Sequence, residues 1–418
     1  MEKTVIELFA GVGGFRVGLN NITKIAKNGI AIEKGPWSFL WANQWEPSTK
    51  IQHAFNCYNT RFPSDLNNSN IDITKVDKKS IPDHTLLTAG FPCQDYSVAR
   101  TLKNEKGIEG KKGVLWWEIN NILKEKRPPF VLLENVDRLL KSPAKQRGQA
   151  FGIILRCFAD LGYGVQWRVL NAADYGHPQK RRRIFIFAFH KKTNYFKCFV
   201  GNSDFSQQTI ASSTIFKIFA SNLLDKRLNY ETSISSKIYK TTADLSDKFT
   251  FSFENAGYML KYKIITAKLV ANYNGKIKTL RQCLDSKNVP EYCYNVDVNK
   301  FAKLKGPKKI NRIAPNGHKY VYSEGGIPFP DKLNTAARTM LTSEGTINRS
   351  SHLILDPISM KYRILSPLEC ERLDEFPDNW TNTGMPEKRR YFMMGNALVC
   401  GLINTIGKEI ELIIEKEP

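Results

Sequence analysis

A cysteine and a glutamate, each placed where an apolar segment ends, are the residues of this chain best suited to chemistry. Cys93 follows the apolar segment 84–89 between Pro92 and Gln94, and Glu134 directly follows a second apolar segment. A thiol presented at the rim of a sheet can act as a nucleophile. A lone cysteine is more often a small filler of the core, so this interpretation depends on partners elsewhere in the chain.

The thiol and the carboxyl group together predict addition to an electron-poor ring, such as a pyrimidine. A thiolate can add at C6, and a carboxyl group that burial keeps protonated can stabilise the charge that develops near N3. Glu134 ends the apolar segment 130–133, so we expect it to be desolvated. A structural carboxylate at a strand end is the alternative.

A basic run, residues 179–183 (Gln-Lys-Arg-Arg-Arg), leads into a further apolar segment. In a strand, alternate side chains point to opposite faces, so some can face the ring pocket while others meet phosphate groups. Most charge runs are only solvated surface, but this one continues into a core strand.

A glycine-rich loop, residues 9–14 (Phe-Ala-Gly-Val-Gly-Gly), predicts a ligand site near the amino terminus. Glycines let the backbone approach a ligand, and the helix expected at residues 15–19 adds a positive dipole end. Such a loop alone is weak support, because some are only tight turns.

Trp45 lies between Gln44 and Glu46 after the second apolar segment, and it could stack on an adenosine moiety. The two neighbouring side chains could then bind the ribose hydroxyls. A core tryptophan is an equally good interpretation. Asp72 could accept a hydrogen bond from an adenine amino group, or it could cap a helix.

The elements that position these residues follow from six apolar segments separated by longer mixed ones. They are residues 4–9, 37–43, 85–90, 130–134, 164–171 and 183–189. This alternation predicts an α/β fold with a doubly wound, mainly parallel sheet. Ligands of such sheets bind beyond the carboxyl ends of the strands, where Phe9, Cys93 and Glu134 all fall.

The rest of the chain predicts a second, smaller and irregular domain. Residues 191–335 are rich in Lys, Asn, Ser and Thr, and residues 250–253 alternate like a strand. Residues 366–373 resemble a helix start with Ser366 as N-cap, and residues 401–414 an amphipathic helix. We expect a catalytic and cofactor-binding domain at 1–190, the second domain at 191–345 and a segment returning to the first domain at 346–418.

The formal net charge of +22 indicates a polyanionic partner. Nucleic acid is the first candidate and an anionic membrane surface the second; charge for solubility alone is the alternative. No apolar run approaches the roughly 20 residues of a membrane span, and the first residues predict a strand, not a signal peptide. The eight cysteines form no C-x-x-C pair, so we expect no metal site, no disulfide framework and a cytoplasmic location.

Taken together, these motifs resemble those of the DNA cytosine-5 methyltransferase family of prokaryotic restriction-modification systems, in the family's order. The matching segments are the cofactor loop at 7–15, the nucleophile motif at 90–94, the base-binding motif at 134–136, the arginine motif at 179–183, the domain-joining motif at 363–373 and the last cofactor motif at 394–399. The resemblance covers about 1–190 and 335–418. It implies a class I methyltransferase fold, S-adenosylmethionine as methyl donor and double-stranded DNA as substrate.

The resemblance also implies a role for each matching residue. Cys93, within Pro92 to Gln94, would attack C6 of a flipped-out cytosine so that C5 takes the methyl group, while Glu134 bonds N3 and the exocyclic amine and Arg183 supports the ring. The cofactor residues implied are Phe9, Gly11, Gly13, Gly14, Gln44, Trp45, Glu46, Asp72, Ile73, Leu115, Asn396 and Leu398. DNA contacts are implied for Ser97, Arg181 and Thr339.

Three sites depart from the family pattern: Gln44 replaces an acidic residue, Asn121 stands where an arginine is common, and Asp374 with Glu375 replaces a small-residue step before Phe376. Residues 95–113, with glycines and lysines, suit a lid over DNA. Recognition loops are expected within 295–345, and 195–278 would be an insertion of unknown role. A restriction endonuclease encoded alongside is an expected partner of a monomeric enzyme. The alternatives are a transfer RNA methyltransferase of the same superfamily and a DNA-binding module without activity.

Overall fold

One nine-stranded sheet forms the centre of the fold, and its strand order is β2-β1-β3-β4-β6-β5-β9-β10-β8. The computed structural model describes residues 1–65, 67–91, 115–202, 204–224, 230–314 and 317–418. The first six strands are β1 (Thr4–Leu8), β2 (Ser38–Asn43), β3 (Leu86–Gly90), β4 (Phe130–Val136), β5 (Tyr163–Asn171) and β6 (Arg182–His190). All six coincide with the predicted apolar segments.

The sheet is parallel at one end and antiparallel at the other. Strand β1 runs parallel to β2 and β3, and β3 runs parallel to β4. Strand β6 is antiparallel to both β4 and β5. The short connection from Asn171 to Arg182 explains this reversal, because a parallel pair needs a crossover of a dozen or more residues. The predicted α/β fold is confirmed, with an antiparallel extension on one side.

Helices cover both faces of the sheet, as the alternation of side chains along β4 requires. Phe130 and Leu132 pack into one core, and Val131 and Leu133 pack into a second core on the opposite face. The first core includes side chains of α1 (Gly14–Leu19), α2 (His53–Arg61) and α12 (Cys400–Ile414). The second includes side chains of α4 (Leu115–Lys126), α5 (Gln149–Asp160) and α8 (Thr242–Lys248). Such two-sided burial explains why these strands are nearly continuous apolar runs.

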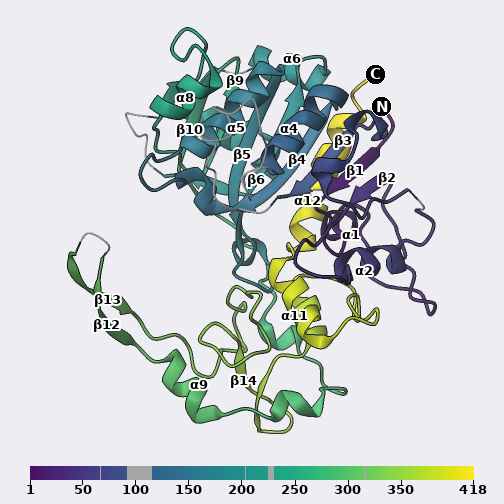
Figure 1. Ribbon diagram of the computed structural model, residues 1–418, viewed down its shortest axis with the longest axis vertical. Coiled ribbons are helices and arrows are strands. Elements are labelled where there is room, and N and C mark those ends of the chain that lie inside the picture. The colour runs from purple at the N-terminus through teal and green to yellow at the C-terminus, as the bar shows by residue number, and fades with distance from the viewer. Residues whose placement is uncertain (66, 92–114, 203, 225–229, 315–316) are drawn as a thin grey trace.

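The stretch 195–278 extends this same sheet, which differs from its expected place in the second domain. Strand β9 (Ala256–Leu260) pairs with β5, β10 (Lys263–Ala267) pairs with β9, and β8 (Glu231–Ser233) forms the edge. The stretch also contains α6 (Asn194–Asn202), α7 (Gln207–Ser212), β7 (Ser221–Leu223) and β11 (Leu269–Ala271). The lower lobe in Figure 1 therefore begins near residue 279, later than predicted.

Residues 250–253, predicted as a strand, lie in irregular structure before β9. Their alternating aromatics serve packing instead. The ring of Phe253 contacts Phe151 and Trp167 edge to face, with centroids 4.9 and 5.8 Å apart. Phe249 and Phe253 are both buried in the second core, so the alternation reflects aromatic anchors of a loop.

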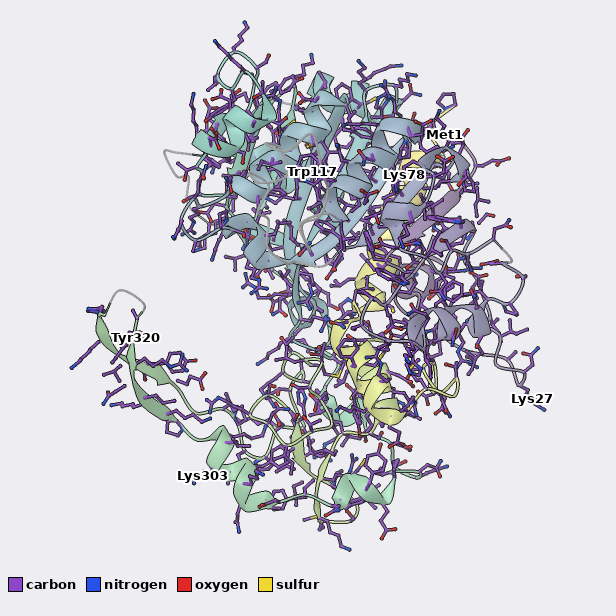
Figure 2. All side chains as sticks on the ribbon, in the orientation of Figure 1. Met1, Lys27, Lys78, Trp117, Lys303 and Tyr320 are labelled. Carbon is purple, nitrogen blue, oxygen red and sulfur yellow. The ribbon has the colours of Figure 1, made fainter. Side chains whose placement is uncertain are left out.

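The lower lobe has a small core of its own, formed by Cys293, Phe301, Leu353 and Ile364. Its elements are α9 (Val298–Lys305), β12 (Lys308–Ile313), β13 (Lys319–Glu324), β14 (Leu353–Leu355) and β15 (Tyr362–Ile364). Strands β12 and β13 pair only with each other and extend away from the rest of the molecule (Figure 1). Figure 2 shows side chains such as Tyr320 projecting from this ribbon.

The chain returns to the upper lobe through α10 (Pro367–Leu373), α11 (Glu387–Asn396) and α12. The predicted cap of α10 is confirmed: the Glu369 N–H donates to the Ser366 hydroxyl, and the Glu369 carboxylate accepts from the Ser366 N–H. The predicted terminal helix is confirmed as α12. No helix within the described ranges is long and apolar enough to cross a membrane.

Replacing Gly18 with alanine is expected to destabilise the fold at the contact of α1 with α12. A Cβ there would lie 2.5 Å from the Ile403 Cβ and 2.7 Å from the Cys400 carbonyl oxygen. Overpacking of this kind costs about 1–3 kcal/mol, more than alanine gains in helix propensity. Urea unfolding measures the loss. Gly201→Ala is the control, because no atom lies within 4 Å of its Cβ, and an equal loss there would contradict the packing argument.

Candidate active site

A cavity of about 220 Å³ lies at the carboxyl ends of the parallel strands and collects many of the predicted site residues. It is lined by Glu7, Phe9, Ala10, Gly11, Val12, Gly14, Phe15, Gln44, Glu46, Ala54, Gly90, Glu134, Phe392, Met393, Asn396, Ala397 and Leu398. Segments from both ends of the chain therefore meet here. Their meeting agrees with the expected binding edge of a doubly wound sheet.

The glycine-rich loop enters this cavity with a left-handed backbone. The φ angle is 54° at Phe9, 56° at Gly11 and 89° at Gly13, a region that glycine adopts without steric cost. The Gly11 N–H donates to the side-chain oxygen of Gln44, 2.7 Å away. Gln44, the departure from the family pattern, thus fixes the loop to the end of β2.

Glu46 lies beside Gln44 and is tied to two helices. Its Oε2 accepts a hydrogen bond from the Ala54 N–H at 2.9 Å, in the first turn of α2. Its Oε1 is paired with Arg389 of α11. Arg389 thereby joins the C-terminal segment to the wall of the cavity.

Glu134 and Arg183 form an ion pair in the wall of the cavity, with Oε1 and Nε 2.8 Å apart. Glu134 lies directly opposite Gly90 in the pairing of β4 with β3, and Arg183 lies opposite Val136 in β6. Burial raises the pKa of Glu134, although the charges of Arg183 and Arg181 oppose the rise. The site therefore favours a protonated carboxyl group more than water does.

Arg181, for which the resemblance implies a DNA contact, is buried in the structure. Its side chain is only 1% exposed, and it donates to the carbonyl oxygens of Met340 and Gly395 at 3.2 and 3.0 Å. Burial lowers its pKa to about 10. Arg181, which directly precedes β6, thus bonds two segments far along the chain. The hydroxyl of Thr339, for which a DNA contact is also expected, donates to the Lys180 carbonyl oxygen.

Five of the predicted cofactor residues do not line this cavity. Trp45 is 39% exposed, and Asp72 accepts from the Thr74 N–H at 3.0 Å as the cap of a short helix. Ile73 is buried and Leu115 half-buried in the second core. Gly13 packs toward Tyr58 and Phe62.

The nucleophile loop lies outside the described residues. This applies to Pro92, Cys93, Gln94 and Ser97 and to the predicted lid at 95–113. Its start is fixed, because the side-chain amide of Asn135 donates to the Phe91 carbonyl oxygen at 2.9 Å.

Glu7 belongs to the predicted cofactor loop but was not predicted as a site residue. It lies inside the buried strand β1, is 0% exposed and lines the cavity. Its carboxyl oxygens accept from the Phe15 N–H and the Tyr58 hydroxyl, each at 3.3 Å. Its signal in the sequence is a carboxylate within the apolar run 5–8. Phe392 and Met393, which also line the cavity, carry no such signal.

Glu7 makes the stability of the fold depend on pH. Burial raises its pKa to about 8, against the opposing charge of Arg16. Between about pH 4.5, the ordinary value, and pH 8 the unfolded chain ionises while the folded chain stays protonated, so stability falls as pH rises. The expected loss is about 1.4 kcal/mol per pH unit at most.

Replacing Glu7 with glutamine removes this dependence. We expect the free energy of unfolding of Glu7→Gln, relative to the unchanged chain, to rise from pH 5.5 to pH 8. Urea unfolding at both pH values measures it, with the exposed Glu291→Gln as the control. A difference that is constant with pH would contradict the assignment.

Comparisons with known proteins agree with this geometry. The model of the C-5 cytosine-specific DNA methylase family matches residues 3–412. The chain is 47% identical over 412 residues to the Type II methyltransferase M.Sau3AI of Staphylococcus aureus, covering 98% of this chain and 95% of that protein. It is 34% identical over 189 residues to the Type II methyltransferase M.HhaI of Haemophilus parahaemolyticus, covering 45% of this chain and 50% of that protein.

The fold also resembles a solved structure, the Dnmt2 methyltransferase of S. pombe. The TM-score is 0.57 at 17% identity, over 99% of this chain and 98% of that one. At this identity the likeness concerns the fold. The match over nearly the whole chain is what decides the assignment: this protein belongs to the C-5 cytosine-specific DNA methylase family, and it is a DNA cytosine-5 methyltransferase.

Proposed function

We propose that this chain is a modification methyltransferase that uses Cys93 as nucleophile and Glu134 as acid on a cytosine flipped out of duplex DNA. The main support for the proposal is that Glu134 and the glycine-rich loop line the same cavity. Glu134, paired with Arg183, lines the same 220 Å³ space as Gly11 and Gly14. A base held by Glu134 would lie next to whatever the glycine loop binds.

The residues of the cavity fit S-adenosylmethionine. A Cβ at Gly11 would meet no atom within 4 Å, so the loop leaves open space there. Phe9, Phe15 and Phe392 offer apolar surface, and the polar groups of the wall can meet ribose hydroxyls and the amino-acid part. When bound, this cofactor supplies an electrophilic methyl group.

The chain itself performs the steps that make cytosine reactive. The Cys93 thiolate adds to C6, and the electrons of the C5–C6 double bond make C5 nucleophilic. The protonated Glu134 donates a hydrogen bond to N3 as charge develops there. After C5 has taken the methyl group, loss of the C5 proton and cleavage of the C6–sulfur bond restore the thiolate.

Chain length supports this pairing of Cys93 with Glu134. Gly90 and Glu134 are register partners in adjacent strands, and Cys93 follows Gly90 by three residues. Three residues span at most about 11 Å, so this separation is compatible with the proposed pairing. Flipping the base costs a few kcal/mol, which contacts in such a pocket offset.

The match to the Staphylococcus aureus relative includes the region expected to read the DNA. It spans 98% of this chain and therefore includes much of residues 295–345. We infer that the two proteins share a recognition sequence. A restriction endonuclease of the same specificity is the expected partner, and one monomer in the cytoplasm would act on each flipped base.

Bisulfite sequencing of DNA from cells that express this chain tests the proposal. We expect complete protection from conversion at cytosines in one short sequence, the same sequence that the Staphylococcus aureus relative modifies when tested in parallel. A parallel assay of methyl incorporation into duplex DNA and into transfer RNA distinguishes a DNA methyltransferase from a transfer RNA methyltransferase. Incorporation into RNA alone would overturn the proposal.

A further inference from the structure

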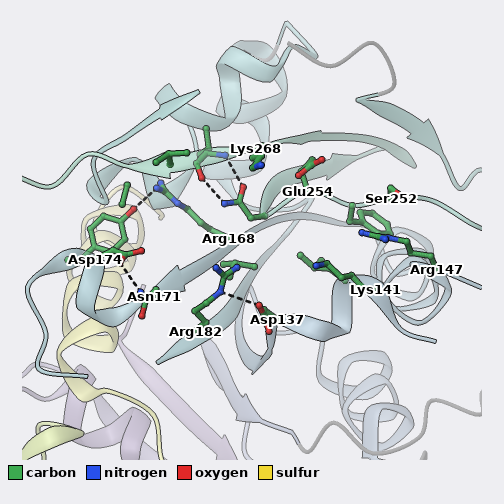
Figure 3. Close-up of a pocket in the computed structure, with 18 residues that line it drawn as sticks. Asp137, Lys141, Arg147, Arg168, Asn171, Asp174, Arg182, Ser252, Glu254 and Lys268 are labelled. Carbon is green, nitrogen blue, oxygen red and sulfur yellow. Dashed lines mark hydrogen bonds and ion pairs between the residues drawn. The ribbon is translucent and has the colours of Figure 1, made fainter. Parts of the chain in front are cut away.

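A second and larger cavity measures about 610 Å³, and Figure 3 shows the residues that line it. We call it the flank groove. Arg182 in its lining is the sequence neighbour of Arg183 in the candidate active site. One wall comes from the short helix Asp137–Lys141 after β4, from Arg147 before α5 and from Arg182 at the start of β6. The other wall includes Ser252, Glu254 and Lys268 of the stretch 195–278. The groove therefore exists only because this stretch extends the sheet.

The flank groove has an excess of positive charge. Its lining includes five basic side chains, Lys141, Arg147, Arg168, Arg182 and Lys268, and three carboxylates, Asp137, Asp174 and Glu254. Asp137 is paired with Arg182, with Oδ2 and Nε 3.2 Å apart, and Asp174 accepts a hydrogen bond from Asn171 at 2.8 Å. The excess of two cations favours an anionic ligand.

Three cations of the groove are free to meet that ligand. Lys141, Arg147 and Lys268 are exposed, and none forms an ion pair within the part of the chain that the structure describes. Arg168 has a structural role, because its guanidinium donates to the carbonyl oxygens of Phe216 and Phe219 at 3.0 and 2.9 Å. Arg168 is therefore not counted among the cations that meet the ligand.

The position of the groove indicates which anion it meets. Arg182 in the groove and Arg183 in the ion pair with Glu134 are neighbours on β6, where successive side chains point to opposite faces. Asp137 follows Glu134 by three residues. Both Arg182 and Asp137 thus lie at the edge of the sheet that carries Glu134, where a strand of DNA that delivers its base to Glu134 would pass.

We propose that the flank groove binds backbone phosphates of duplex DNA beside the target cytosine, through Lys141, Arg147 and Lys268. This inference rests on the proposed function and assigns a role to the stretch 195–278. Lysine and arginine contacts to phosphate position a duplex without reading its sequence. The groove therefore raises affinity for DNA of any flanking sequence and does not enter the chemical step.

The test is the salt dependence of binding to a duplex of about 30 base pairs that carries the site found by bisulfite sequencing. In the variant K141A/R147A/K268A, the slope of log affinity against log salt should become shallower by about 0.9 for each phosphate that the protein no longer neutralises. We expect a decrease of about two to three in slope and roughly a tenfold or greater loss of affinity near 0.1 M salt. The value of kcat at saturating DNA should not change.

The matched control is K24A/K27A/K34A, which removes three exposed lysines of the segment between α1 and β2 (Lys27 is labelled in Figure 2). It changes net charge equally, and its slope should stay close to that of the unchanged chain. An unchanged slope in K141A/R147A/K268A, or an equal change in the control, would contradict the proposal that the flank groove binds DNA phosphates. Failure of the proposed function is recognised separately, because the unchanged chain would then incorporate no methyl groups into DNA.

A second variant, Ser252→Glu, tests the opposite wall. It adds a carboxylate to the groove without removing any cation, so it should weaken binding and leave kcat unchanged. If Ser252→Glu binds the duplex with the affinity of the unchanged chain, the result contradicts binding of DNA in the flank groove. Thermal unfolding of all variants checks that the fold is retained.

Discussion

Replacing Cys93 with alanine is expected to abolish methylation of DNA, lowering the rate by roughly 10⁴-fold or more. Without the thiol no covalent bond forms at C6, so C5 does not become nucleophilic. Incorporation of labelled methyl groups into DNA measures the effect. Binding of DNA and of S-adenosylmethionine should persist, because the thiol acts in the chemical step. If Cys93→Ala methylates DNA at the rate of the unchanged chain, the covalent mechanism is wrong.

The chain offers a matched control at Cys198, an exposed cysteine in α6. Cys198→Ala removes the same atom from a site away from the cavity and should keep full activity. A duplex with 5-fluorocytosine at the target gives an independent readout. Fluorine cannot leave as the proton does, so the bond to Cys93 should persist through denaturation in the unchanged chain and be absent in Cys93→Ala.

Replacing Glu134 with alanine is expected to slow methyl transfer by about 10²–10³-fold, the usual effect of losing one donor at developing charge. Glu134→Gln keeps an N–H donor in the same place and should lose less. Single-turnover rates on the target duplex separate the two variants. Glu134→Ala also leaves Arg183 without its 2.8 Å partner, so part of its expected loss comes from the broken ion pair.

The pH profile distinguishes a proton donor from a merely structural carboxylate. Because burial raises the pKa of Glu134, the protonated form persists to higher pH than for an ordinary carboxyl group. The rate of the unchanged chain should fall as pH rises through that pKa. Glu134→Gln cannot ionise and should lack this decline. Identical pH profiles for the unchanged chain and Glu134→Gln would contradict the role of Glu134 as a proton donor.

The active-site edge could be predicted because its residues lie where buried strands end. Phe9, Glu134 and Arg183 each adjoin an apolar run, and such runs identify strands that are buried on both faces. The capping box at Ser366 was equally clear, since its side-chain partners lie three residues apart. Local patterns therefore predicted the elements and many of the residues that line the 220 Å³ cavity.

Features that depend on distant contacts could not be predicted. Arg181 and Arg183 have the same residue type and stand two positions apart, yet only Arg181 is buried, by contacts with Met340 and Gly395 that lie 159 and 214 residues away. The short strands β8 to β10 lie in a stretch rich in lysine and serine, where three to five residues carry little periodic signal. The pairing of β9 with β5, not its own composition, makes it part of the sheet.

The pairing of β9 with β5 also means that the stretch 195–278 cannot be treated as a removable accessory. Without it, the backbone N–H and C=O groups of β5 that now face β9, from Val165 to Arg168, would lie open. An unprotected edge of this kind templates pairing with other chains. A shortened variant designed to resemble a minimal enzyme would therefore be prone to aggregation, and any compact relative must protect the same border by other means.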